Sequence, residues 1–347
     1  SRGTEINSNF SISYDAPWLK GLSFKATGAY DYSSSQNKNL STRYQTYAPN
    51  SAGQLIKYDD PESVQSNDLG SGQYTTELMV GQFSVAYARS FGKHNIDAMA
   101  LVEGRDYKYN SMAVYTEKIP FAGLPEISMG SPAQGTSQSG YSGHTRTAGY
   151  VFRVKYDYNN TYLAEFSGRY DGSYNFSGNV SSKRWGFFPS FSAAWRMSNE
   201  KFMENTKSWL SDLKFRASIG LLGNDAVSAY SFLSTYSFAG NRVFDGNVYN
   251  SLYTSSVANP ELTWSKTRTS NLGFDITLWD DKLGIEFDWF YNLNYDILAS
   301  MAGDKAPSMG GYYHSVANHD RYANYGVEWT VSHRNKFQLG GKPFQYG

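Results

Sequence analysis

Cysteine and long hydrophobic runs are missing from this 347-residue chain. The absence of cysteine excludes disulfides and thiolate-ligated metal sites. The longest apolar runs, such as residues 98–102, have five residues, whereas a transmembrane helix needs about 18 or more. The sequence therefore excludes a helical membrane protein.

Net charge is also missing, since 31 Lys and Arg residues balance 31 Asp and Glu residues. A nucleic-acid-binding domain normally carries a basic excess or a basic stripe, so we expect no nucleic-acid partner. The chain has no phosphate-binding GxxxxGK[ST] loop and no nucleophile elbow in a strand-to-helix context. Nothing in the sequence supports an enzyme, and we predict neither catalytic residues nor a cofactor.

Metal-binding patterns are absent as well. His314 and His319 are five residues apart in an expected loop, not at the i, i+4 spacing of a zinc-binding helix. Residues 171–182 weakly resemble a calcium-binding loop, but an EF-hand requires Glu at position 12, where this chain has Ser182. We predict no metal site and a surface turn in this segment. The remaining histidines are scattered: His94, His144 and His333.

Aromatic residues, by contrast, make up 17% of the chain and recur with a period of two. Between residues 148 and 158, apolar side chains alternate with positions that include Arg153, Lys155 and Asp157. Such alternation is typical of a half-buried β-strand. Residues 159–161 have turn composition, and the alternation then resumes at Tyr162. The pattern predicts a β-hairpin.

The same alternation predicts eleven strands, at 7–15, 21–32, 74–91, 95–109, 146–158, 162–171, 185–197, 213–221, 264–278, 283–292 and 324–333. Short connections alternate with long ones along the whole chain. Outer-membrane barrels show this asymmetry, with short periplasmic turns and long extracellular loops. We therefore expect an all-β fold, an antiparallel up-and-down transmembrane β-barrel of which the chain forms a part. One connection is expected to be helical, from Phe202 to Trp209, and residues 134–143 to form a surface loop.

The placement of the aromatic residues favours a membrane barrel over a soluble sheet. In the first hairpin the apolar face has Tyr150 and Tyr170 at one end, Tyr158 and Tyr162 at the other, and Phe, Val, Ala and Gly in the middle. Eight residues at ~3.3 Å each, tilted by ~40°, span about 20 Å along the membrane normal. That span approximates the apolar band between two aromatic girdles.

The polar face allows two pairings to be predicted. Lys155 is expected opposite Glu165, a favourable cross-strand pair. A four-residue turn after residue 278 places Asp275 opposite Glu286, which is unfavourable alone. Either a cation from an adjacent strand intervenes, or this second register is wrong.

Seven segments resemble SusC-like TonB-dependent transporters (the SusC/RagA family), in the family's order and over residues 146–333. They are Arg169–Ser173 with Arg184–Arg196, Leu213–Gly220 with Gly223-Asn224, Asn259–Thr267, Asn271–Gly273 and Tyr325–Trp329. Residues 1–145 fit only through their alternation. The chain starts without Met and ends inside an apparent strand, so we expect residues 1–347 to be a fragment of the barrel domain that lacks the plug domain, the TonB box and the C-terminal strands.

The resemblance implies a large plugged barrel in the outer membrane of Bacteroidota that imports oligosaccharides or peptides. It also implies energy from the TonB complex and a SusD-like surface lipoprotein as partner. Two alternatives remain open: a passive outer-membrane porin, and a soluble carbohydrate-binding β-sandwich in which the apolar faces pack on each other.

Two sets of residues are candidates for ligand contact. If the apolar face meets lipid, the lumen is lined by charged residues of the opposite face: Arg153, Lys155, Glu165, Arg169, Asp171 and Arg216. For any single one of them, a solvated or mutually paired wall residue is the favoured alternative. Aromatic residues of the expected loops could stack on sugar rings or simply pack within the loops: Tyr44, Tyr47, Tyr141, Tyr174, Tyr230, Tyr312 and Tyr313.

Overall fold

The computed structural model describes residues 1–42, 44, 46–58, 67–120, 122–123, 125–130, 137–228, 231–301 and 316–347. The chain divides into two compact units. The first consists of Ser1–Phe10, Gly28–Val80 and Arg105–Thr145, and the second of Ser11–Thr27, Gly81–Gly104 and Arg146–Gly347. The six charged candidates all belong to the second unit.

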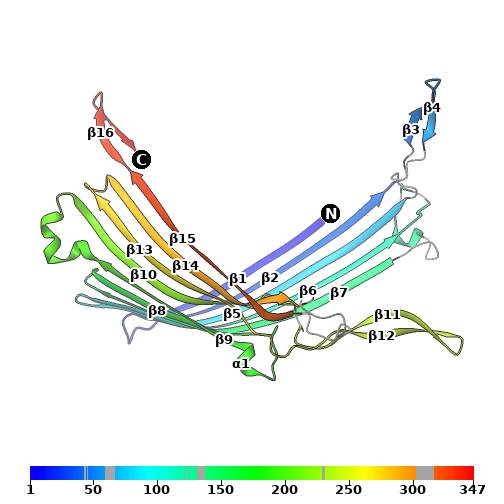
Figure 1. Cartoon of the computed structure of the whole chain (residues 1–347), viewed down its shortest axis with the longest axis horizontal. Helices are drawn as coiled ribbons and strands as arrows, with labels where there is room; N and C mark the ends of the chain where they lie inside the picture. Colours follow the sequence, from blue (N-terminus) through cyan, green and yellow to red (C-terminus); the bar gives the residue numbers. More distant parts are fainter. Residues whose placement is uncertain are drawn as a thin grey trace. The chain divides into compact units, whose positions relative to one another are not determined.

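Among the described residues, one sheet has eleven strands, and each strand pairs with the preceding one in the sheet's order (Figure 1). This is the expected up-and-down order. The strands are β1 (Arg2–Asp15), β2 (Leu22–Ser41), β5 (Asp68–Phe91), β6 (His94–Thr116), β7 (Ser137–Tyr158), β8 (Tyr162–Ser173), β9 (Trp185–Arg196), β10 (Leu210–Asn224), β13 (Ser265–Leu278), β14 (Leu283–Ser300) and β15 (Val316–His333). β1 and β15 are the outer strands, and the sheet does not close on itself.

Several strands extend further than the alternation predicts, most of them toward the long connections. β10 also extends the other way, since it begins at Leu210, inside a connection that was expected to be short. β7 begins at Ser137, so the surface loop expected at 134–143 is wrong from that residue onward, and residues 134–136 lie outside the described part. The side chains of residues 137–142 are all exposed. Where both faces of a strand meet water, backbone pairing continues without apolar alternation, and the sequence signal disappears.

The short connections follow the prediction closely. Asn159 and Asn160 adopt positive φ angles of 53° and 54°, a conformation that Asn tolerates better than most residues. The Asp157 carboxylate accepts a hydrogen bond from the backbone N–H of Asn160 at 2.8 Å. The resulting register places Tyr158 opposite Tyr162 and Lys155 opposite Glu165, which confirms the predicted hairpin.

The second predicted hairpin is also confirmed, and its unfavourable pair has an explanation. β13 and β14 place Asp275 directly opposite Glu286. The adjacent strand β10 brings Arg216 to Asp275, with its Nη2 atom 2.7 Å from Oδ1. The intervening cation was the correct alternative.

The apolar face of the sheet is exposed to its surroundings. The exposed fraction is 55% for Tyr150, 45% for Phe166, 48% for Phe191 and 74% for Trp329. The described residues contain only eight buried hydrophobic side chains, and the sheets besides the eleven-stranded one have two strands each. A sandwich would bury this face against a second sheet, so the sandwich interpretation is wrong.

Three two-stranded hairpins were not predicted. They are β3–β4 (Thr46–Pro49 and Leu55–Tyr58), β11–β12 (Thr235–Phe244 and Asn247–Ser256) and β16–β17 (Asn335–Leu339 and Lys342–Tyr346). The first two lie in connections that we expected to be irregular.

Helical structure is scarce. The connection expected to be helical contains the 3₁₀ turns Met197–Asn199 and Lys201–Thr206 rather than a helix that reaches Trp209. The α-helix α1 (Ser181–Arg184) and a 3₁₀ turn at Ile127–Met129 are also present. Over the described ranges, no helix combines the length and the apolar character needed to cross a membrane.

Candidate functional site

The six charged candidates lie on one face of the sheet, opposite the exposed aromatic face. The β7–β8 register places Lys155 opposite Glu165 and the β10–β9 register places Arg216 opposite Ala194. Side chains alternate between the two faces of a strand, so the sequence parity in these registers puts the six on the face that carries Ser192 and Asn271. We call this the polar face of the sheet.

Arg216 lies between two carboxylates. Its guanidinium donates to Asp275 from Nε at 3.1 Å and from Nη2 at 2.7 Å, and Nη2 also donates to Asp288 at 3.1 Å. The three side chains are between 27% and 35% exposed. β10, β13 and β14 are therefore joined by one cation, a role for which the planar guanidinium is well suited.

Arg169 forms the second charged cluster. Its Nε and Nη2 atoms each donate to a carboxylate oxygen of Asp171 at 2.9 Å, which is a bidentate pair. Glu103 of β6, whose side chain is 9% exposed, lies 3.7 Å from Nη2 of Arg169 and accepts a hydrogen bond from Gln82. Asp171 is thus the ion-pair partner of Arg169.

Two weaker pairs complete the set. Lys155 and Glu165 are 3.5 Å apart, as predicted from the register. Arg153 donates to Asp97 of β6 at 3.3 Å. Their side chains are between 35% and 47% exposed, so each pair contributes little to stability.

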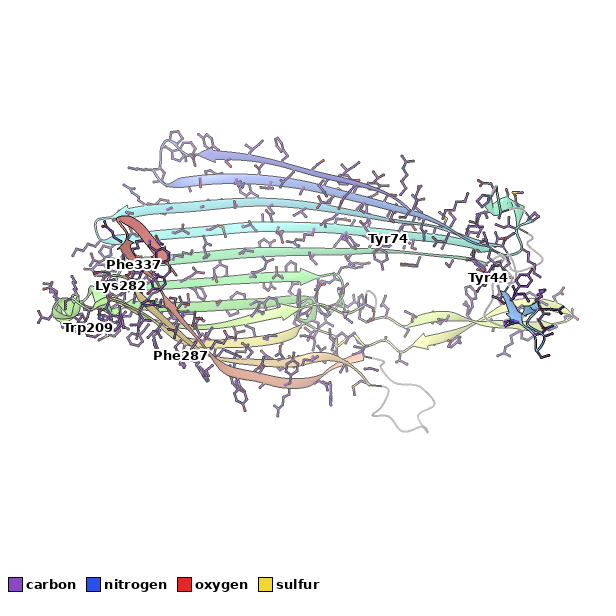
Figure 2. The ribbon with its side chains drawn as sticks, turned by 90° about the horizontal axis from the view of Figure 1, so that it is seen from above. Tyr44, Tyr74, Trp209, Lys282, Phe287 and Phe337 are labelled. Carbon is purple, nitrogen blue, oxygen red and sulfur yellow. The ribbon has the colours of Figure 1, made fainter. Side chains whose placement is uncertain are left out.

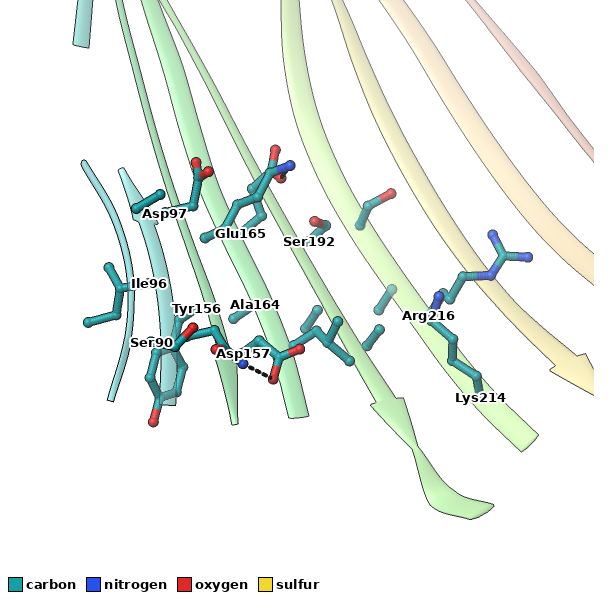
Figure 3. Close-up of a pocket in the computed structure, with 18 of the residues that line it drawn as sticks. Ser90, Ile96, Asp97, Tyr156, Asp157, Ala164, Glu165, Ser192, Lys214 and Arg216 are labelled. Atoms are coloured by element: carbon teal, nitrogen blue, oxygen red, sulfur yellow. Dashed lines mark hydrogen bonds and ion pairs between the residues drawn. The ribbon is translucent and has the colours of Figure 1, made fainter. Parts of the chain in front are cut away.

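A hollow of about 1160 Å³ runs over the polar face (Figure 3). Figure 3 shows four of the residues that line it, each from a different strand: Asp97, Glu165, Ser192 and Arg216. Lys214, Asn271 and Asp288 also line it. Both signs of charge are present, so the surface fits polar, hydrogen-bonding molecules better than a polyanion.

Sequence reasoning missed the partners of these residues. Glu103, Asp97, Asp275 and Asp288 each lie 56 or more residues from their partner in the sequence. To predict these partners, the registers of several neighbouring strands must be known together. The position of Lys214 directly opposite Asp275 likewise follows from the register alone.

The aromatic candidates that the structure describes belong to different elements or connections. Tyr141 lies in β7, so its assignment to a loop was wrong; its side chain is 62% exposed and its ring lies 6.1 Å from that of Tyr109. Tyr174 follows the end of β8 directly and is half-buried. Tyr44 is exposed, and Tyr47 is exposed on β3. Outside the described residues lie Tyr230, Tyr312 and Tyr313.

The long connections of the second unit are fastened by a small apolar core. Phe176, Phe188, Leu262 and Trp264 are buried against one another, and the Trp264 ring lies 5.4 Å from that of Phe176 and 5.2 Å from that of Phe188. Three of the four belong to connections or lie directly before a strand. We call this cluster the loop core.

Hydrogen bonds reinforce the loop core. Trp264 donates from Nε1 to the carbonyl of Arg184 at 3.0 Å. The amide of Asn318 donates to the carbonyl oxygens of Thr263 and Asp296, both at 2.8 Å. The connections after β8 and β12 are thereby tied to β15, so the segments on which recognition would depend are held by the sheet.

Metal ligands do not come together. Within the described ranges, no group of three or more His, Asp or Glu side chains could hold a metal ion. His94 pairs with Tyr156 at 2.7 Å, His144 with Asp106 at 2.8 Å, and His319 with its neighbour Asp320.

Comparison with known proteins identifies the family. The family model described as TonB dependent receptor-like, beta-barrel matches residues 1–346. TonB-dependent receptor P3 of Formosa agariphila is 28% identical over 331 residues, which are 94% of this chain and 30% of that protein. TonB-dependent receptor SusC of Bacteroides thetaiotaomicron is 28% identical over 260 residues, 72% of this chain and 24% of that protein. The chain thus spans less than a third of the length of these relatives.

The fold has a counterpart among solved structures. The RagAB peptide importer in its closed-closed state superimposes with a TM-score of 0.80 at 20% identity, over 97% of this chain and 34% of that one. The expected resemblance and fold class are therefore confirmed. The chain belongs to the TonB-dependent receptor-like β-barrel family, whose members lie in the outer membrane.

Proposed function

We propose that this chain is part of the barrel wall of a transporter that imports oligosaccharides or peptides across the outer membrane with energy from TonB. Membership of the receptor-like barrel family supports this function. The observation that carries it is the division of one sheet into two faces. One is an exposed aromatic face suited to lipid, and the other carries charged and polar residues around a hollow of about 1160 Å³.

A SusD-like surface lipoprotein is the proposed partner. The similarity to SusC and to the RagAB importer supports a two-protein assembly. In this proposal, the polar face with Arg153, Lys155, Glu165, Arg169, Asp171 and Arg216 lines the lumen. The connections fastened by the loop core lie on the extracellular side, because outer-membrane barrels have their long loops there.

Enzymatic activity is not part of the proposal. The family consists of receptors and transporters, and the paired charges of the polar face include no nucleophile held by a base. A passive porin is the competing function, since it would share the two-faced sheet.

The test uses the full reading frame that contains this chain, expressed in a Bacteroidota host. We expect the protein in the outer-membrane fraction, with heat-modifiable migration, and co-purification of a lipoprotein. Uptake of labelled oligosaccharide or peptide pools should stop when TonB is deleted. Uptake that continues without TonB would instead establish a porin, and a protein recovered in the soluble fraction would refute both functions.

A further inference from the structure

The exposed aromatic face of the sheet is not uniform, because three alanines interrupt it. Ala164, Ala193 and Ala217 lie side by side on β8, β9 and β10. The row continues with Leu272 on β13 and Trp289 on β14. Small side chains in a row of large ones leave a depression in the surface.

A hollow of about 740 Å³ lies over Ala193 and Ala217. That volume is within the ~300–1,000 Å³ range of small-molecule sites. Leu272 and Trp289 are also among its lining residues. Two residues further along each strand, about 7 Å away, an aromatic row forms a wall that consists of Tyr162, Trp195, Phe215, Phe274 and Phe287.

The aromatic wall is continuous. Ring centroids are 6.3 Å apart between Trp195 and Phe215, 6.4 Å between Phe215 and Phe274, and 5.2 Å between Phe274 and Phe287. The last pair is stacked with an interplanar angle of 19°. Such contacts fix ring orientations, so the wall keeps its shape when the hollow is empty.

Glu200 holds the polar end of this wall. It accepts hydrogen bonds from Trp195 Nε1 at 3.1 Å and from the Tyr162 hydroxyl. Arg216 also borders the hollow, but its guanidinium is bound to Asp275 and Asp288 on the other face. The hollow thus presents hydrocarbon and ring surfaces, with the polar groups of its wall already satisfied.

The end of the sheet at which the hollow lies determines what reaches it. Glu200 belongs to the connection between β9 and β10, and Trp209 of that connection lies at the same end as Lys282 of the next turn (Figure 2). The carbonyl of Trp209 accepts a backbone hydrogen bond from Trp279 at 2.8 Å. These are the short connections, which face the periplasm in outer-membrane barrels.

We propose that the hollow over Ala193 and Ala217 is a binding site for one acyl chain of a phospholipid of the periplasmic leaflet. The face lies in the outer membrane, so its surroundings are hydrocarbon, and an acyl chain is the apolar molecule available at that depth. One ordered acyl chain fills the depression between the alanine row and the aromatic wall. Mobile lipids of a fluid bilayer would pack against this depression only loosely. The site stands on the membrane location of the family and is independent of the transported substrate.

The experiment measures phospholipid retention by native mass spectrometry. The full-length protein is purified in a nonionic detergent and titrated with dioleoylphosphatidylethanolamine. Ala193→Leu and Ala217→Leu fill the hollow, whereas Ala148→Leu makes the same change at an exposed position of the same face outside it. We expect one retained phospholipid in the wild type and in Ala148→Leu. Displacing about two methylene groups should weaken binding about tenfold in either hollow variant.

Several results would overturn the proposal. Equal retention in all variants would place the lipid elsewhere, and equal loss in Ala148→Leu would show a general effect of the apolar face. A retained species with the mass of lipopolysaccharide would assign the hollow to the other leaflet. Heat-modifiable migration verifies that each variant is folded. If a leucine variant does not fold, Glu200→Ala serves instead. It releases Trp195 and Tyr162 and must still weaken phospholipid retention. Loss of transport does not bear on this proposal, because a protein that fails to import substrate should still retain the phospholipid.

Discussion

Arg216 should be the most costly charged residue of the polar face to remove. Replacing it by Met keeps most of the side-chain volume and deletes three hydrogen bonds to Asp275 and Asp288. Glu286 lies directly opposite Asp275, and Glu328 lies directly opposite Asp288. Asp275 and Asp288 would then face these two glutamates without their cation.

The magnitude follows from the partial exposure of the cluster. Hydrogen bonds to charged groups contribute about 1.5–3 kcal/mol in protected sites, and exposed pairs about 0.2–1 kcal/mol. Arg216 is 35% exposed, and Lys214, opposite Asp275, still supplies one positive charge. We therefore expect Arg216→Met to lower the free energy of unfolding by about 2 kcal/mol.

Urea-induced unfolding of the full-length protein in lipid vesicles, followed by tryptophan fluorescence, measures this change. Adding Asp275→Asn and Asp288→Asn to Arg216→Met should recover at least half of the loss, since the repulsion and the unpaired charges disappear together. An Arg216→Met variant within about 0.5 kcal/mol of the wild type would refute the reasoning. So would a triple variant less stable than the single one.

Three further changes have distinct expected outcomes. Trp264→Ala should lower stability by about 3–5 kcal/mol and expose the neighbouring connections to proteolysis, because it opens the loop core beside Phe188. Lys155→Met should change stability by less than about 0.5 kcal/mol in the same urea assay, since its pair with Glu165 is long and exposed. Gly21→Ala should cost about 3 kcal/mol or prevent folding, because the residue has a φ of +96° and a Cβ would lie 2.1 Å from a backbone oxygen.

Matched controls separate these effects from general damage. Gly28→Ala adds the same methyl group where nothing lies within 4 Å and φ is not positive, so it should be tolerated. Phe187→Ala removes an aromatic ring that is 48% exposed and should leave the proteolysis of the connections unchanged. Cleavage of Phe187→Ala as fast as of Trp264→Ala would contradict the role of the loop core.

The sequence alone was sufficient for the strand order and for two registers. Turn length and the period of two fix which residues face each other, and a shift by one residue would turn every aromatic side chain to the wrong face. For this reason Tyr158 opposite Tyr162 and Asp275 opposite Glu286 could be predicted. Each of these pairs follows from local contacts within its own hairpin.

The loop core was missed because it depends on distant segments. It joins Phe176 to Leu262 and Trp264, more than 80 residues later, and no periodicity links them.

The β11–β12 hairpin was missed for a different reason. Its exposed aromatic and aliphatic side chains do not alternate strictly, so the segment resembled a loop. Its turn at Asp245-Gly246, where both φ angles are positive, is nevertheless a local hairpin signal.

The ion pairs of the polar face change what its charges can do. Each of the six candidates, Arg153, Lys155, Glu165, Arg169, Asp171 and Arg216, has an oppositely charged partner within this chain. Arg153, Lys155 and Arg216 join neighbouring strands. Because these pairs are partly exposed, a polar ligand could compete for one partner at little cost in stability. Ser192 and Asn271 supply uncharged hydrogen-bonding groups in the same hollow, so charged and uncharged groups together define what the polar face offers.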